Sequence, residues 1–169
     1  TGLAPLLLAP LLACGGERPA GQPPAAADTA AAPAGGGREL AYVTNEGSGE
    51  LTVIATANDS VVATIPVGTR PRGVRVSADG QTVFVALSGS PRCPPTMPDE
   101  ECEKLKADKS KDGIGVIDVA TRTVSRVLPG GSDPEAFDIS RDGSRLFVSN
   151  EDAHVASIVD VASGKVVAT

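Results

Sequence analysis

Two cysteines in the middle of the chain have the spacing of a disulfide-closed loop. Cys93 and Cys102 are separated by eight residues within the segment 91–112. A zinc site would need further cysteine or histidine ligands nearby, and a covalent haem would need a C-x-x-C-H motif; the segment contains neither. Together with the secretion signal described below, the spacing predicts a disulfide. No metal ion and no cofactor is assigned.

The end of the same segment carries the opening of a calcium-loop pattern. Asp108, Ser110 and Asp112 stand at alternate positions before Gly113, as the first ligands of an EF-hand loop do. Val119 occupies the twelfth position, where such a loop needs a bidentate glutamate. Two lysines between the ligands add positive charge. We therefore favour a solvated polar turn over a calcium site.

His154 is the single histidine of the chain, which restricts acid–base chemistry. A Ser–His–Asp triad would have to use it, but the sequence has no G-x-S-x-G turn to present a nucleophilic serine. We interpret His154 as a surface residue in the turn after "SNEDA", rather than as a haem ligand or general base. No catalytic residue is assigned.

The N-terminal residues have the pattern of a bacterial lipoprotein signal. Residues 3–13 form an apolar run that is too short for a membrane-spanning helix, which needs about 20 residues. The run has the length of a signal-peptide core, and "LLAC" places Cys14 at a lipobox-like junction. We predict a signal peptide over residues 1–14, truncated at its N-terminus, and lipidation of Cys14. A plain secretory signal with an incidental cysteine is the alternative.

Residues 15–38 are composed mainly of alanine, glycine and proline. Such a segment cannot bury a hydrophobic core, and its four prolines argue against an alanine-rich helix. We predict a disordered linker between the lipid anchor and a folded domain.

The composition of the chain favours a β-rich domain after this linker. One tyrosine, three phenylalanines and no tryptophan accompany many valines, threonines and glycines, a mixture typical of short strands and turns. The 21 acidic residues outnumber the 15 basic residues, and no basic run is present. Nucleic acid is therefore not expected as a partner.

The remainder of the chain, residues 39–169, consists of internal repeats. Within residues 41–68, the first 24 align with 146–169 at an offset of 105, and residues 65–85 align with 128–148 at an offset of 63. A middle copy begins 42 residues after the first, so 63 − 42 = 21 residues are inserted in it, between Ser88 and Gly113, where the loop 91–112 lies.

Each unit of about 42 residues contains four short strand patterns, among them "TVFVAL" (82–87), "TVSRVL" (123–128) and "RLFVSN" (145–150). Turn residues separate them, and the two "DG" sequences at 79–80 and 142–143 suit tight hairpin turns. Four antiparallel strands per repeat of this length are typical of a β-propeller blade. The predicted fold is all-β: a β-propeller of four-stranded antiparallel blades, incomplete in this chain, with about 2.7 blades.

These units resemble the YVTN β-propeller repeats of bacterial and archaeal extracytoplasmic proteins. The resemblance rests on "YVTN" at 42–45, "FVSNEDA" at 147–153, "VIDVAT" at 116–121 and the "IPVGxxPxGVxVSxDG" pattern at 65–80. It implies that "PxGVxVSxDG" forms the innermost strand of a blade. The chain is then expected to start at the second strand of a blade and to be a fragment of a longer propeller.

Ligands of propellers usually gather at the central channel and at the loops over one face. The residues best placed for that face flank the inner strands: Arg70, Arg72, Asp133 and Glu135. Another set follows the neighbouring strands: Asn45, Glu46, Asn150 and Glu151. Asparagine after a strand is more often part of a turn than of a recognition site.

The function we predict is that of a non-enzymatic binding or scaffold module at the cell envelope. Its expected location is extracytoplasmic, in the periplasm or at the cell surface, with a lipid anchor in the membrane and a protein or small-molecule ligand at the propeller face. An accessory or cofactor-binding propeller of a periplasmic oxidoreductase system, similar to quinoproteins or haem nitrite reductases, is the alternative. A propeller lactonase is a third possibility, without matching site residues.

Overall fold

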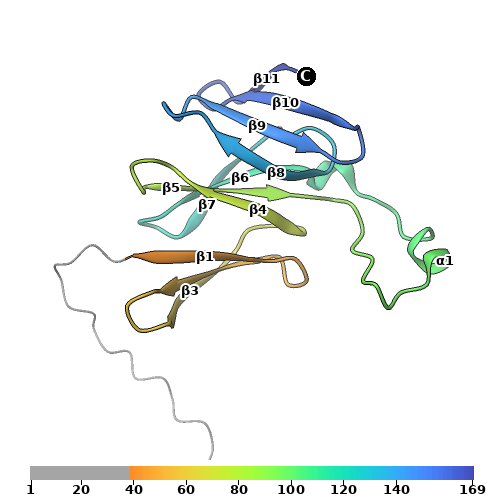
Figure 1. The fold of residues 1–169 in the computed structure, drawn as a ribbon, viewed down its shortest axis with the longest axis horizontal. Coiled ribbons are helices and arrows are strands. Elements are labelled where there is room, and N and C mark those ends of the chain that lie inside the picture. Colours follow the sequence, from red (N-terminus) through yellow and green to blue (C-terminus); the bar gives the residue numbers. More distant parts are fainter. Residues whose placement is uncertain (1–38) are drawn as a thin grey trace, which may run out of the picture. The chain divides into compact units, whose positions relative to one another are not determined.

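The computed structural model describes residues 39–169. They form eleven strands in three separate antiparallel sheets, and each sheet is built from consecutive strands (Figure 1). The predicted signal peptide, lipidated Cys14 and linker 15–38 lie outside the described residues. Within residues 39–169, no helix is both long enough and apolar enough to span a bilayer.

The strand order confirms the predicted propeller arrangement. The first sheet contains β1 (Leu40–Asn45), β2 (Glu50–Ala55) and β3 (Ser60–Pro66). The second contains β4 (Pro71–Val76), β5 (Thr82–Leu87), β6 (Gly113–Asp118) and β7 (Thr123–Leu128). The third contains β8 (Pro134–Ile139), β9 (Arg145–Asn150), β10 (Val155–Asp160) and β11 (Lys165–Ala168). The described residues thus form one three-stranded blade followed by two four-stranded blades.

The innermost strands of the two complete blades lie side by side. Strand β4 packs against β8 and also against β1 of the first blade. A Cβ atom at Gly73 would lie 2.8 Å from the carbonyl oxygen of Glu135, so glycine allows the backbones of β4 and β8 to approach closely. The "PxGVxVSxDG" segment is therefore the inner strand, as expected.

Two apolar clusters hold the blades face to face. The cluster between the first and second blades is formed by Leu51, Val53, Ile65, Val67, Val83, Val85, Leu87 and Ile117. The cluster between the second and third blades is formed by Phe84, Ala86, Ile114, Val116, Leu128, Phe137, Leu146, Val148 and Val159. Strand β5 contributes alternate residues to the two clusters, because successive side chains of a strand point to opposite faces. The middle blade is thus buried on both sides.

Connections between antiparallel strands alternate between the two ends of the sheets. One end, which we call the insertion end, carries the turns 46–49 and 151–154, the connectors 67–70 and 129–133, and the long connection 88–112. The other end, the hairpin end, carries five short turns. Connection 88–112 contains the one-turn helix α1 (Asp99–Cys102) and extends away from the sheets (Figure 1).

The hairpin end repeats the same turn in successive blades. Ser77 donates a hydrogen bond to the carboxylate of Asp79 at 2.6 Å, and Ser140 donates one to Asp142 at the same distance. Gly80 and Gly143, which follow these aspartates, have φ angles of 70° and 73°. Glycine adopts this left-handed conformation more easily than other residues, because it has no Cβ atom. The predicted tight turns at the two "DG" sequences are confirmed.

Asp142 is expected to titrate well below the usual range of an aspartate. Hydrogen bonds from Ser140 and from the backbone and side chain of Ser144 lower its pKa to about 2. A carboxyl group whose pKa is lower in the folded state stabilises the fold above its unfolded pKa of about 3.9, and this contribution is lost as the pH falls toward the folded value. NMR titration of the side-chain carboxyl carbon measures the pKa directly.

The matched control for this prediction uses the neighbouring blade. Ser140→Ala should raise the pKa of Asp142, because it removes the largest stabilising hydrogen bond. The same substitution should leave the lowered pKa of Asp79 unchanged, since that carboxylate is stabilised by its own Ser77. A pKa of about 3.9 for Asp142 in the unsubstituted protein would contradict the expectation.

Candidate functional site

Arg72 of the inner strand β4 stands at the centre of a cluster of charges at the insertion end. The guanidinium of Arg72 donates hydrogen bonds to Glu135 at 2.5 Å and to Glu151 at 2.7 Å. It also lies 3.6 Å from the carboxylate of Asp133. The partners come from β8, from the turn after β9 and from the connector before β8, so one side chain joins three segments of the adjacent blade.

Arg70 extends the same cluster toward the first blade. Its guanidinium lies 3.5 Å from Glu46 and 4.0 Å from Asp133. Arg70 and Asp133 both have a left-handed backbone, with φ of 42° and 53°. They occupy the same place in successive connectors, 63 residues apart, so the repeat also reproduces this uncommon backbone geometry.

The repeat places opposite charges at equivalent positions of adjacent blades. Three pairs are each separated by 63 residues and each form an ion pair: Arg70 with Asp133, Arg72 with Glu135, and Arg75 with Asp138. Equivalent residues of neighbouring inner strands lie side by side. Because the residue is basic in one repeat and acidic in the next, the two attract each other across the blade interface. All four predicted ligand-face residues are thus brought together, and they pair with one another.

Arg72 remains charged in this environment. Burial lowers the pKa of its guanidinium, but the hydrogen bond to Glu151 and the nearby carboxylates of Glu135 and Asp133 outweigh burial and raise the pKa above its ordinary value. The cluster contains two arginines and four carboxylates, counting Glu46. It therefore carries a net negative charge and offers no vacant cation to a ligand.

Asp133 is the most buried member, with a side-chain exposure of 4%. Its carboxylate accepts a hydrogen bond from Ser88, the first residue after β5. Its backbone N–H donates to the carboxylate of Asp112 at 3.0 Å. The other oxygen of Asp112 accepts from the backbone N–H of Gly89 at 2.6 Å. Asp112 thus joins both ends of the insertion to the connector that precedes β8.

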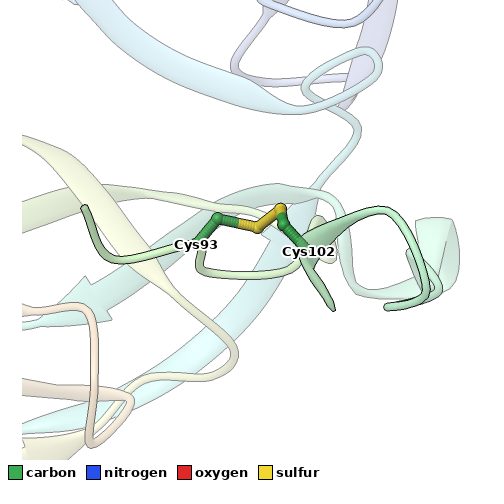
Figure 2. The surroundings of a disulfide bond; sticks show 2 residues. All are labelled: Cys93 and Cys102. Atoms are coloured by element: carbon green, nitrogen blue, oxygen red, sulfur yellow. A yellow bond between two sulfur atoms is a disulfide. The ribbon is translucent and has the colours of Figure 1, made fainter. Parts of the chain in front are cut away.

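The insertion is closed at its base and again farther out. The backbone N–H of Asp108 donates to the carbonyl oxygen of Gly89 at 2.9 Å. Cys93 and Cys102 form a disulfide with Cα atoms 5.7 Å apart (Figure 2). The loop is therefore pinned by two cross-links, one backbone and one covalent, and presents a defined shape.

A lysine of the insertion also contacts the third blade. The ammonium group of Lys109 pairs with Asp152 and donates a hydrogen bond to Ser90 at 2.7 Å. Burial lowers the pKa of Lys109, but the hydrogen bond to Asp152 and nearby carboxylates outweigh it and raise the pKa. The same hydrogen bond lowers the pKa of Asp152. Both groups are thus held charged, and the insertion is attached to the turn after β9.

The calcium-loop pattern is used for contacts within the protein. The carboxylate of Asp108 caps a 3-10 turn (Lys109–Lys111) by accepting from the N–H of Ser110, and both oxygens of Asp112 accept backbone hydrogen bonds. Asp112 is nearly buried, so the predicted solvated turn holds for Asp108 and Ser110 only. Across residues 39–169, no group of three or more acidic, cysteine or histidine side chains is placed to hold a metal ion.

The asparagines that end β1 and β9 make structural hydrogen bonds. Asn45 donates to Thr52 at 2.8 Å, and Asn150 accepts from Ser157 at 2.6 Å and donates to the carbonyl oxygen of Gly130 at 2.5 Å. The bond of Asn45 joins β1 to β2, and the bonds of Asn150 join β9 to β10 and to the connector before β8. Both asparagines hold strands together, and neither makes a side-chain hydrogen bond within its turn.

Two hollows lie at the insertion end. One, of about 410 Å³, is bordered by the charge cluster through Arg70, Asp133 and Glu151, by Cys93 of the insertion, and by His154. The histidine has a left-handed backbone with a φ of 53°. It is a surface turn residue, as predicted, but it borders a hollow. The second hollow, of about 550 Å³, lies between the first blade and the insertion.

Several residues make contacts in the site that were not expected from the sequence. Ser88 is the repeat equivalent of Glu46 and Glu151: it lies 42 residues after Glu46 and 63 residues before Glu151. The repeat alignment could therefore have placed Ser88 next to the charge cluster. Lys109 and Asp112 lie in the insertion, which has no counterpart in the other blades. No pattern in the sequence indicates their contacts.

Comparison with known proteins supports the fold and leaves the family open. No family model matches the chain. Antigen Lp49 of Leptospira interrogans is 28% identical over 109 residues, which cover 64% of this chain and 22% of the antigen. The chain therefore spans about a fifth of the length of this relative.

Solved structures with the same architecture are propeller proteins. Hydrazine synthase of Kuenenia stuttgartiensis is 26% identical with a TM-score of 0.60, covering 76% of this chain and 32% of that one. A candidate 6-phosphogluconolactonase of Bacteroides fragilis is 22% identical with a TM-score of 0.54, covering 76% and 34%. The dihydro-heme d1 dehydrogenase NirN is 18% identical with a TM-score of 0.53, covering 76% and 23%. The chain forms part of a β-propeller; the predicted YVTN membership stays a prediction.

Proposed function

We propose that this protein is a non-enzymatic binding or scaffold module, held outside the cytoplasm by a lipid on Cys14, and that it binds its partner at the insertion end. The observation that carries the proposal is the doubly cross-linked insertion, which gives one blade a rigid loop that the other blades lack. Its disulfide suits an oxidising, extracytoplasmic location. The likeness to an antigen is in keeping with exposure at the cell envelope.

We assign the charge cluster to the scaffold. Both of its arginines pair with carboxylates, and these pairs join adjacent blades.

The proposal is tested by shortening the insertion. Gly89 and Asp108 are already hydrogen-bonded to each other, so residues 91–106 can be replaced with Gly-Ser while both are kept. The shortened protein should fold with unchanged thermal stability of the propeller but should lose partner complexes that chemical cross-linking traps on intact cells. A pair of substitutions at the hairpin end, Arg141→Gln with Lys165→Gln, is the control and should retain them. Equal trapping by the shortened protein would reject the proposal.

An accessory propeller of an oxidoreductase system is the second candidate. It is favoured by the likeness to hydrazine synthase, at 26% identity. The two candidates differ in the absorption spectrum of the full-length protein purified from its native envelope. A haem or quinone cofactor absorbing in stoichiometric amount favours the oxidoreductase role, whereas a spectrum without such bands favours the binding module.

The lipid anchor is tested by cell fractionation. Cys14→Ser removes the only thiol that lipidation could use at the "LLAC" junction. We expect the protein to move from the membrane fraction to the soluble extracytoplasmic fraction. Unchanged membrane attachment would reject the anchor and leave the propeller fold unaffected.

A further inference from the structure

The hollow between the first blade and the insertion has a predominantly basic lining. Its charged residues are Arg70, Arg92, Lys106 and Lys111 against Glu46 and Asp108, in a protein whose overall net charge is −6. The insertion supplies three of the four cations. The positive charge of the hollow therefore comes mostly from the insertion, which has no counterpart in the other repeats.

Three of the cations in the hollow are available to a ligand. Within residues 39–169, Lys106 and Lys111 form no ion pair, and both are exposed. Arg92 reaches Glu46 at 4.0 Å only and keeps 59% of its side chain exposed. Arg70 is committed to the charge cluster.

The two carboxylates of the hollow are already occupied. Asp108 accepts hydrogen bonds from Ser110, and these lower its pKa, with a further contribution from the charge of Lys111. Glu46 lies 3.5 Å from Arg70. The four cations of the lining outnumber its two carboxylates, so the hollow keeps a net positive charge.

Arg92 borders the hollow beside the turn 46–49. Its guanidinium lies over Gly47, since a Cβ atom at that glycine would be 3.5 Å from it. The other three lining glycines, Gly49, Gly68 and Gly89, serve close packing within the protein. A Cβ atom at any of them would contact or overlap another part of the chain.

The lining also narrows the class of ligand. It contains no aromatic side chain, so it lacks the flat surfaces on which nucleic-acid bases stack. Three cations on different residues of the insertion suit several separate negative charges on a flexible chain better than one compact anion. Charge complementarity therefore favours a peptide rich in aspartate and glutamate.

We propose that the hollow between the turn 46–49 and the insertion binds an acidic peptide segment of a partner protein, with Arg92, Lys106 and Lys111 as the recognising cations. This inference rests on the proposed function and specifies the chemistry of its partner. It makes the insertion a recognition element as well as a rigid loop.

The test measures binding of a fluorescein-labelled hexaglutamate peptide to the full chain by fluorescence anisotropy. We expect saturable binding that weakens as ionic strength rises, because the contacts are exposed ion pairs. Lys106→Gln with Lys111→Gln should weaken binding about fivefold or more. The matched control, Arg141→Gln with Lys165→Gln, makes the same change in net charge at the hairpin end and should bind normally.

Two outcomes would overturn the inference. One is equal binding by the lysine variant and the control, which would mean that only overall charge matters. The other is absence of hexaglutamate binding, including the case in which inorganic phosphate binds instead. Either result leaves the cross-linking test of the shortened insertion unaffected, so failure of this inference is distinguishable from failure of the proposed function.

Discussion

Replacing Arg72 with methionine is expected to lower the free energy of unfolding of the full chain by about 3 kcal/mol, because removing one member of a buried ion pair leaves its partners uncompensated. The guanidinium is 11% exposed, and its partner Asp133 is 4% exposed. Glu135 and Glu151 are half exposed, which keeps the expected loss at the lower end of the range for buried pairs. Urea unfolding of the two proteins measures the difference.

The control for this experiment lies on the same strand. Arg75→Met also removes a guanidinium from an ion pair between β4 and β8, with Asp138. Here the side chains are 50% and 78% exposed, so we expect a loss below about 1 kcal/mol. Similar losses for the two substitutions would show that the cluster around Arg72 does not hold the blades together.

Gly89→Ala is expected to open the base of the insertion. A Cβ atom at this position would overlap the carbonyl oxygen of Asp108, and that oxygen belongs to the backbone and cannot rotate away. Overpacking of this kind typically costs about 1–3 kcal/mol. Faster tryptic cleavage after Lys104 and Lys106, together with a lower midpoint of urea unfolding, is the expected result.

A second glycine provides the comparison for that substitution. A Cβ atom at Gly115 would make its nearest contact at 3.4 Å, with the flexible side chain of Leu87. Gly115→Ala should therefore leave tryptic cleavage of the insertion unchanged. If Gly89→Ala also leaves it unchanged, the contact between Gly89 and Asp108 does not close the loop.

The repeat alignment was sufficient to predict the strands and their order within blades. Strands β5, β7 and β9 begin and end where the patterns "TVFVAL", "TVSRVL" and "RLFVSN" do. The inner position of β4 and β8 also followed from the resemblance. Prediction succeeded here because blade structure depends on local alternation and on turn residues, which every copy repeats.

The contacts between blades were harder to predict, although part of the signal was present. Arg72 and Glu135 are aligned residues of opposite charge, and this inversion indicates a cross-blade pair once equivalent inner strands are known to be neighbours. Considered singly, each residue suggested a ligand contact. Their mutual pairing depends on the geometry of β4 against β8, which the alignment does not contain.

The insertion could not be placed from the sequence. The contacts of Asp112 with Gly89 and Asp133 span 23 and 21 residues and involve backbone groups, which have no sequence signature. Only the disulfide was suggested by spacing. The part of the chain to which we assign recognition is therefore the part for which the repeats carry no information.

The central claim, that the protein binds its partner at the insertion end, is tested most directly by photo-cross-linking in the native envelope. A photo-reactive amino acid is introduced at Lys104, which is exposed on the insertion, or at Arg141, which is exposed at the hairpin end. We expect a covalent adduct with a partner from position 104 and none from position 141. Adducts from position 141 alone, or equally from both positions, would contradict binding at the insertion end.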